Sequence, residues 1–128
     1  MSRKLDTLLF AALVLCFGAK ASAAPNEAET ARIERLIDHI ARQTDISFIR
    51  NGESFEASAA AAHLRSKMSS AGWRIKTADH FIDYLASRSS MSGTMYEIRL
   101  ADGRLVLARD WLRGELKMID SKRAGKQQ

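Results

Sequence analysis

Serine, histidine and aspartate side chains in this chain supply the residue types of a serine hydrolase. Ser90 or Ser92 would be the nucleophile, His63 the base and Asp83 the orienting acid. However, the sequence has no G-x-S-x-G motif, and residues 87–93 are a small polar run typical of a loop. Serines in such loops usually bond to nearby backbone. We therefore expect a structural loop, with a hydrolase that uses the Ser89–Gly93 loop and His63 as the alternative.

Cationic side chains form a second group with possible chemistry. Arg50 follows an extended segment, and His63, Arg65 and Lys67 follow it along the chain. Arginine binds carboxylates or phosphates through two parallel hydrogen bonds, and loop amides could add donors. The candidate ligand-binding residues are Arg50, Asn51, His63, Arg65, Lys67, Ser89, Ser90, Ser92 and Gly93. The competing interpretation is structural: Arg50 caps a helix C-terminus or pairs with Glu53, Glu56 or Asp83.

A metal site has little support in the sequence. His39, His63 and His80 are scattered, with neither an H-x-x-x-H pair nor an H-E-x-x-H motif. The one cysteine, Cys16, lies in an apolar N-terminal stretch. We therefore predict no metal and no cofactor.

The N-terminus has the three-part pattern of a secretory signal peptide. Arg3 and Lys4 precede the apolar residues 8–17, and Ala21-Ser22-Ala23 offers a cleavage site after Ala23. The apolar stretch is shorter than the about 20 residues that span a bilayer. We predict a signal peptide at 1–23, a periplasmic location, and no transmembrane segment after cleavage.

Length and charge limit the organisation of the mature chain. Cleavage would remove Arg3, Lys4, Lys20 and Asp6, so the net charge of the 128-residue chain would fall from +5 to +3. We expect one domain at 24–121 and a flexible basic tail at 122–128. An exported protein rarely meets nucleic acid, so we expect none as a partner. The candidate partners are an envelope protein or an anionic cell-wall ligand.

Hydrophobic periodicity predicts four helices. They cover 27–44, 55–71, a third that begins after Thr77 as N-cap, and a last one capped by Asp110. Asn51-Gly52 is a turn signal, and Gly72 is a helix stop.

Alternation in 96–100 and 105–107 around Asp102-Gly103 predicts one β-hairpin. The expected fold is α+β and mainly helical: three N-terminal helices, one hairpin and a C-terminal helix in a single domain. Because a lone hairpin is marginal in water, it must pack on the helices. A partner could alternatively add to the hairpin edge, with Tyr96, Trp111 and Trp73 as anchors, although such aromatics are more often core residues.

Three segments together resemble a known family. They are 48–52, 63–67, and 74–78 with Phe81-Ile82 and the loop 89–93 before Tyr96. Their order and spacing, over about Ile33 to Leu116, resemble the YfeK-like family of small exported bacterial proteins, a domain of unknown function. That family usually has proline where this chain has Met95, which removes a fixed φ before the strand. The resemblance implies that the protein is exported and shares the fold of that family, and it implies no activity.

The sequence therefore indicates an exported, cofactor-free binding or interaction module, more consistent with a non-enzyme than with an enzyme. The alternative functions are a small anion- or carboxylate-binding protein and the serine hydrolase described above.

Overall fold

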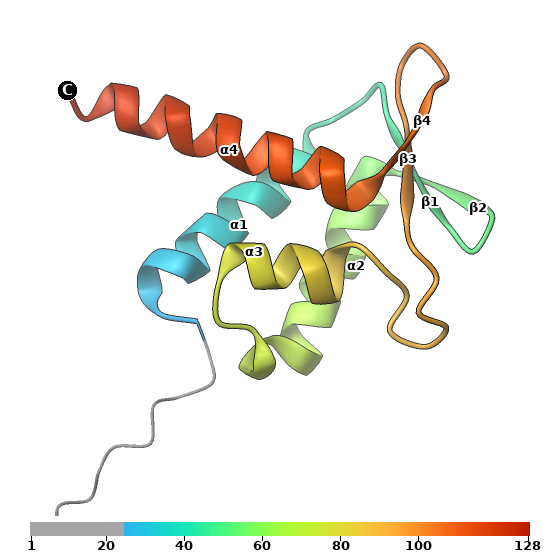
Figure 1. Cartoon of the computed structure of the whole chain (residues 1–128), viewed down its shortest axis with the longest axis horizontal. Helices are drawn as coiled ribbons and strands as arrows, with labels where there is room; N and C mark the ends of the chain where they lie inside the picture. Colours follow the sequence, from blue (N-terminus) through green and yellow to red (C-terminus); the bar gives the residue numbers. More distant parts are fainter. Residues whose placement is uncertain (1–24) are drawn as a thin grey trace, which may run out of the picture.

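Four α-helices and a four-stranded antiparallel sheet make up residues 25–128, the part of the chain that the computed structural model describes (Figure 1). The predicted signal peptide at 1–23 lies outside the described residues. The sheet stands at one end of the helices, which pack together on the other side of the molecule (Figure 1).

The first helix, α1 (Glu27–Ala41), begins at its N-cap, Asn26, whose side chain accepts a hydrogen bond from the Glu29 amide at 2.9 Å. Its apolar face is fully buried and comprises Ile33, Leu36, Ile37 and Ile40. The prediction of this helix is confirmed, although it ends at Ala41 rather than at residue 44.

The sheet corrects the predicted fold. Its strands are β1 (Ser47–Arg50), β2 (Glu53–Glu56), β3 (Glu97–Arg99) and β4 (Leu105–Leu107), in the order β2-β1-β3-β4. The mainly helical α+β class fits, but the prediction of a single hairpin was wrong, because β1 and β2 form a second one. β1 also pairs with β3, so the two hairpins join into one sheet. An isolated hairpin is only marginally stable in water, and the β1–β3 pairing stabilises both hairpins by joining them into a four-stranded sheet.

The β1–β2 turn explains the extra hairpin. Asn51 and Gly52 have φ of 51° and 79°, the two consecutive positive values of a tight hairpin turn. Phe48 and Phe55 are then directly opposite each other. The predicted second helix began at Phe55, whereas Phe55 belongs to the strand and α2 begins at Ala57.

The second helix, α2 (Ala57–Ala71), packs closely through small side chains. Ala57, Ala60 and Ala61 are buried together with Leu64. A short 3₁₀ turn, η1 (Gly72–Arg74), follows the helix and leads the chain toward the next one.

The third helix changes type part-way. α3 (Ala78–Phe81) is capped by Thr77, whose Oγ1 accepts from the His80 amide at 3.0 Å, so the predicted N-cap is confirmed. It continues as a π-helix, η2 (Ile82–Ala86), which widens the last turn. The buried Ser87 hydroxyl donates to the Ile82 carbonyl at 2.5 Å and helps to end it.

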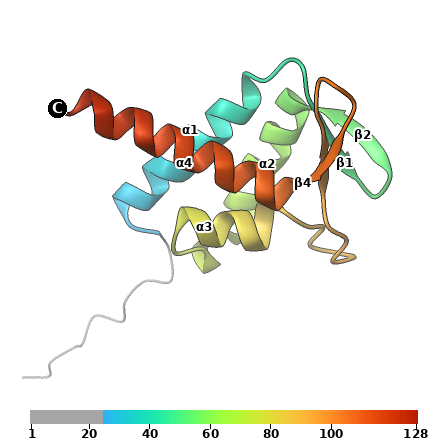
Figure 2. The same cartoon turned by 45° about the horizontal axis from the view of Figure 1, so that its top comes forward.

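The last helix, α4 (Ala108–Lys126), follows β4 without a side-chain N-cap, so Asp110 lies inside it rather than at its cap. It is helical as far as Lys126 and includes most of the segment that we expected to be a flexible tail. α4 crosses α1 (Figure 2). Arg32 and Asp120 form a 2.8 Å ion pair between the two helices. Between residues 25 and 128, no helix is long and apolar enough to cross a membrane.

Candidate functional site

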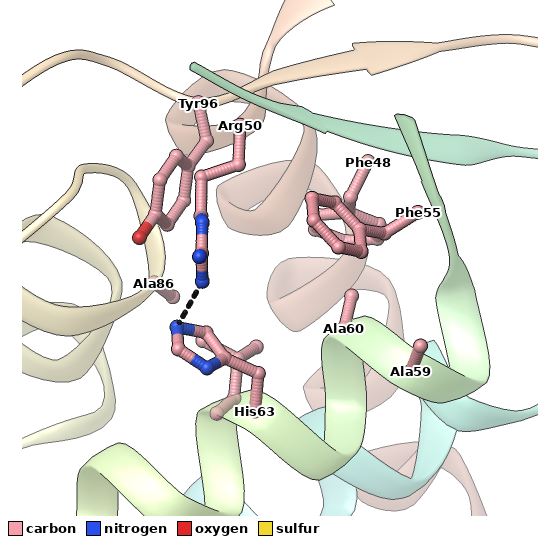
Figure 3. A pocket seen from close by; sticks show the side chains of 9 residues that line it. Phe48, Arg50, Phe55, Ala59, Ala60, His63, Ala86 and Tyr96 are labelled. Atoms are coloured by element: carbon pink, nitrogen blue, oxygen red, sulfur yellow. Dashed lines mark hydrogen bonds between the residues drawn. The ribbon is translucent and has the colours of Figure 1, made fainter. Parts of the chain in front are cut away.

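A pocket of about 210 Å³ lies between the β1–β2 hairpin, α2 and the start of β3 (Figure 3). Most of its wall is apolar or aromatic, with one arginine and one histidine. The lining residues are Phe48, Arg50, Phe55, Ala59, Ala60, His63, Leu64, Ala86 and Tyr96. A mainly apolar cavity with few polar groups is the usual form of a small-molecule site.

Strand and helix periods bring these side chains together. Phe48 and Arg50 are two residues apart on β1, so both point from the same face of the sheet. Ala59 and His63 are one turn apart on α2, which places them on one side of that helix. Ala86, the last residue of the π-helix, lines the same cavity.

Arg50 and His63 meet across the pocket from opposite elements (Figure 3). The Arg50 guanidinium donates from Nη1 to Nε2 of His63 at 3.0 Å, which assigns the ring proton of a neutral His63 to Nδ1. The guanidinium also lies 5.4 Å from the centroid of the Phe55 ring. Tyr96 flanks the pair on one side and Phe48 on the other (Figure 3).

Within residues 25–128, Arg50 has no carboxylate within ion-pair distance. Asp83, one of the partners considered from the sequence, pairs instead with Arg113 at 2.6 Å. Arg50 is nevertheless half-buried. Its positive charge therefore faces the pocket without a compensating anion from the described part of the chain.

The histidine is held in its neutral form. Burial lowers the pKa of His63 below the ordinary value, and the positive charges of Arg50 and Lys67 lower it further. At neutral pH, Nε2 is therefore available as the acceptor for Arg50.

Lys67 lies behind the pocket wall rather than in it. Its Nζ donates to the carbonyls of Leu85 at 2.5 Å and Arg88 at 3.0 Å, and it approaches the Tyr96 hydroxyl at 3.4 Å. Burial, with a smaller contribution from Arg50, lowers the pKa of Lys67 to about 8. Burial also raises the pKa of Tyr96, against the opposing influence of Arg50. Lys67 therefore fixes the end of the π-helix and the position of Tyr96.

Other predicted site residues lie elsewhere or bond locally. Arg65 pairs with Asp38 on α1. The Ser92 hydroxyl donates to the Asn51 side chain at 3.3 Å, and Ser89 Oγ accepts from the Ser92 amide at 3.3 Å. Ser90 and Gly93 line a separate surface hollow beside Arg74. Of the nine residues proposed from sequence, the structure places Arg50 and His63 in the pocket and Lys67 next to it.

The arrangement gives no support to hydrolysis. In the described chain, His63 bonds to Arg50, and no serine hydroxyl forms a hydrogen bond with it. No group of three or more potential metal-ligating side chains occurs among residues 25–128.

Sequence reasoning missed the aromatic wall. Phe48 and Phe55 were assigned to an extended segment and a helix, and Tyr96 was considered as a core or anchor residue. The i, i+2 spacing of Phe48 and Arg50 could have placed both on one strand face, but the second wall required the missed hairpin. Of the other predicted anchors, Trp111 packs edge-on against Phe48 at 6.2 Å and Trp73 is 59% exposed.

The chain is similar to proteins that have no assigned function. The model of a family of unknown function, DUF5329, matches residues 27–120. A protein of Salmonella typhimurium described as "Uncharacterized protein YfeK" is 41% identical over 71 residues, which cover 56% of this chain and 59% of that protein. This match confirms the resemblance noted from the sequence, and it spans less than two thirds of the relative's length. No solved structure matches the chain.

Proposed function

Because the chain belongs to the DUF5329 family, whose function is unknown, we propose a function from its pocket: it binds a small molecule with an apolar body and a carboxylate. The carboxylate pairs with Arg50 and accepts a second hydrogen bond from His63 once that ring is protonated. The apolar body lies against the aromatic side chains of Phe48, Phe55 and Tyr96.

One observation supports this proposal most directly: a half-buried arginine without a carboxylate partner stands in an otherwise apolar cavity. Partial burial of an unpaired charge is unfavourable, and an anionic ligand would offset that cost. Each buried methylene of the ligand would add about 0.8 kcal/mol. The pocket should therefore bind most tightly a ligand that has both an anionic group and an apolar body.

The apolar wall of the pocket also limits the class of ligand that it can bind. A glycan needs many polar partners, whereas this cavity offers Arg50, His63 and the Tyr96 hydroxyl amid apolar side chains. Medium-chain fatty acids and the C-terminal residue of an apolar peptide share the required chemistry. Binding requires no nucleophile, and we propose a binding protein rather than an enzyme.

Export is the second part of the proposal, and it rests on the N-terminal sequence pattern. The basic residues Arg3 and Lys4, the apolar run 8–17 and Ala21-Ser22-Ala23 would direct the chain to the periplasm. Sequencing the N-terminus of the protein recovered from a periplasmic extract should then give Ala24 as the first residue. Recovery of intact Met1 from the cytoplasm would contradict export while leaving the pocket proposal untouched.

Calorimetric titration tests ligand binding. Octanoate and N-acetylleucine represent the two ligand sources, and octanol is the neutral analogue of octanoate. We expect a carboxylate to bind more tightly than octanol. Arg50→Gln should weaken carboxylate binding by about 10- to 100-fold, because a hydrogen bond to a charged group contributes a binding free energy of that size.

Arg99→Gln is the matched control for that variant, because Arg99 is an exposed arginine on the neighbouring strand β3 and does not line the pocket. It should bind like the unmodified protein. Equal binding of octanoate and octanol, or equal losses in the two variants, would contradict the proposed function.

A further inference from the structure

A second hollow of about 440 Å³ lies between α1 and α4. We call it the basic groove and define it by Arg35 of α1, Arg42 at the C-cap of that helix, and Lys122, Arg123 and Lys126 of α4. Met118 and Ile119 supply an apolar floor between these cations. The C-terminal end of α4 projects past α1 (Figure 2).

The charge of the groove is uncompensated. Within the described residues, none of its five cationic side chains has a carboxylate within ion-pair distance. Two acids of α4 are engaged by residues of α1: Asp120 pairs with Arg32 at 2.8 Å, and Glu115 pairs with His39 at 2.5 Å. His39 also lines the groove, and none of the residues that line it carries a carboxylate.

Arg35 adds a separate observation. Its Nε atom is buried, and it has no hydrogen-bond partner within residues 25–128. An unmet donor of this kind is costly, because it has left water without gaining an acceptor. Because this atom is shielded from solvent, an anion at the groove could accept a hydrogen bond from it only after the Arg35 side chain shifts.

We propose that the basic groove binds the anionic phospholipid headgroups of a bilayer surface. Phosphate oxygens would accept hydrogen bonds from the arginines and lysines, while Met118, 36% exposed, would contact apolar parts of a lipid whose headgroup lies in the groove. Long lysine and arginine stems can lie along such apolar surface while their charged ends reach the phosphates. The apolar floor favours a lipid surface over nucleic acid, whose backbone offers charge without an apolar layer.

This surface is separate from the carboxylate pocket, which is formed by β1, β2, α2, the π-helix and the start of β3. The inference stands independently of the proposed function, because no residue lines both sites. Loss of groove function should leave carboxylate binding unchanged.

Vesicle co-sedimentation tests the inference with the purified protein. The probes are vesicles of phosphatidylcholine alone and vesicles of equal parts phosphatidylcholine and phosphatidylglycerol. The groove variant combines Lys122→Gln, Arg123→Gln and Lys126→Gln. A second variant, Arg35→Gln with Arg42→Gln, tests the α1 side.

The matched control combines Lys76→Gln, Arg99→Gln and Lys117→Gln, which remove the same total charge from exposed positions outside the groove. Lys117 lies on the opposite side of α4 from the groove. Circular dichroism verifies that every variant keeps the helical content of the unmodified protein.

We expect binding to the anionic vesicles that weakens with added salt, and no binding to phosphatidylcholine alone. The groove variant should bind about 100-fold more weakly, since each basic residue near an anionic surface contributes about a factor of five. The second variant should also lose affinity, and the control should change little. Equal losses in the groove variant and the control, no vesicle binding, or tighter binding to a double-stranded oligonucleotide at the same salt concentration would each overturn the proposal.

Discussion

His63 makes ligand binding sensitive to pH. Its pKa is below the ordinary value, first because of burial and then because of Arg50 and Lys67. A bound carboxylate beside the ring would raise that pKa, so binding would take up a proton. Carboxylate affinity should therefore increase as the pH falls below neutral, until the ligand itself is protonated near about pH 4 to 5.

Titrations of octanoate at several pH values between neutral and mildly acidic measure this effect. His63→Asn should abolish most of the pH dependence, because asparagine does not titrate. An affinity that is constant or decreases over this interval in the unmodified protein would show that His63 does not contact the ligand carboxylate.

Lys67 gives a second pH-dependent prediction, this time for stability. Its pKa of about 8 in the folded protein is below the 10.5 of an ordinary lysine. Between these pH values the unfolded chain binds more protons than the folded protein, so the contribution of Lys67 to stability grows as the pH rises. Urea unfolding should show Lys67→Met less stable than the unmodified protein, by an amount that increases from neutral pH toward about pH 10.

The destabilisation at neutral pH should be about 1–3 kcal/mol, because the Leu85 and Arg88 carbonyls lose their donor. Lys76→Met is the control, since Lys76 is exposed and no side-chain hydrogen bond of its ammonium group is present in the described structure. Its effect should not vary with pH. A Lys67→Met effect that shrinks with rising pH would contradict the role assigned to this amine.

Among the elements, those with a long periodic pattern were predictable from sequence, whereas strand β2 was not. Four buried positions on α1 repeat at helical spacing, and Thr77 is a recognisable N-cap. β2 has one large apolar residue, Phe55, and an alanine-rich helix follows it at once, so local periodicity assigned Phe55 to the helix. The pairing of Phe48 with Phe55 follows from the local Asn51-Gly52 turn, whereas the pairing of Phe48 with Ile98 joins segments that no local window contains.

The β1–β2 turn can be tested by one substitution. Gly52 has φ of 79°, a region that is unfavourable for residues with a Cβ. Gly52→Ala should lower the free energy of unfolding by about 1–2 kcal/mol, measured by urea denaturation.

Gly114→Ala is the matched control, because Gly114 lies inside α4 and an added Cβ meets nothing within 4 Å. It should stabilise the protein by about 0.5–1 kcal/mol. A Gly52→Ala variant as stable as the unmodified protein, or more stable, would contradict the positive φ assigned to Gly52 in the β1–β2 turn.

In the molecule as a whole, the candidate site depends on contacts between distant parts of the chain. Arg50 and His63 were identified from their chemistry, but Tyr96 comes from a segment far along the sequence. The basic groove likewise joins the first and last thirds of the chain, because α4 crosses α1. Residue types indicated an anionic ligand, whereas the cavity wall that selects an apolar body emerged only from the fold.

The most direct test of carboxylate binding in the pocket is an amide NMR titration of the purified protein with octanoate. We predict saturable shift changes in β1, β2, the first half of α2 and around Tyr96, with the α1–α4 groove unaffected. Octanol should produce much smaller changes, and Arg50→Gln should largely remove those caused by octanoate. No saturable change, or changes centred on the basic groove instead of the pocket, would contradict binding at this site.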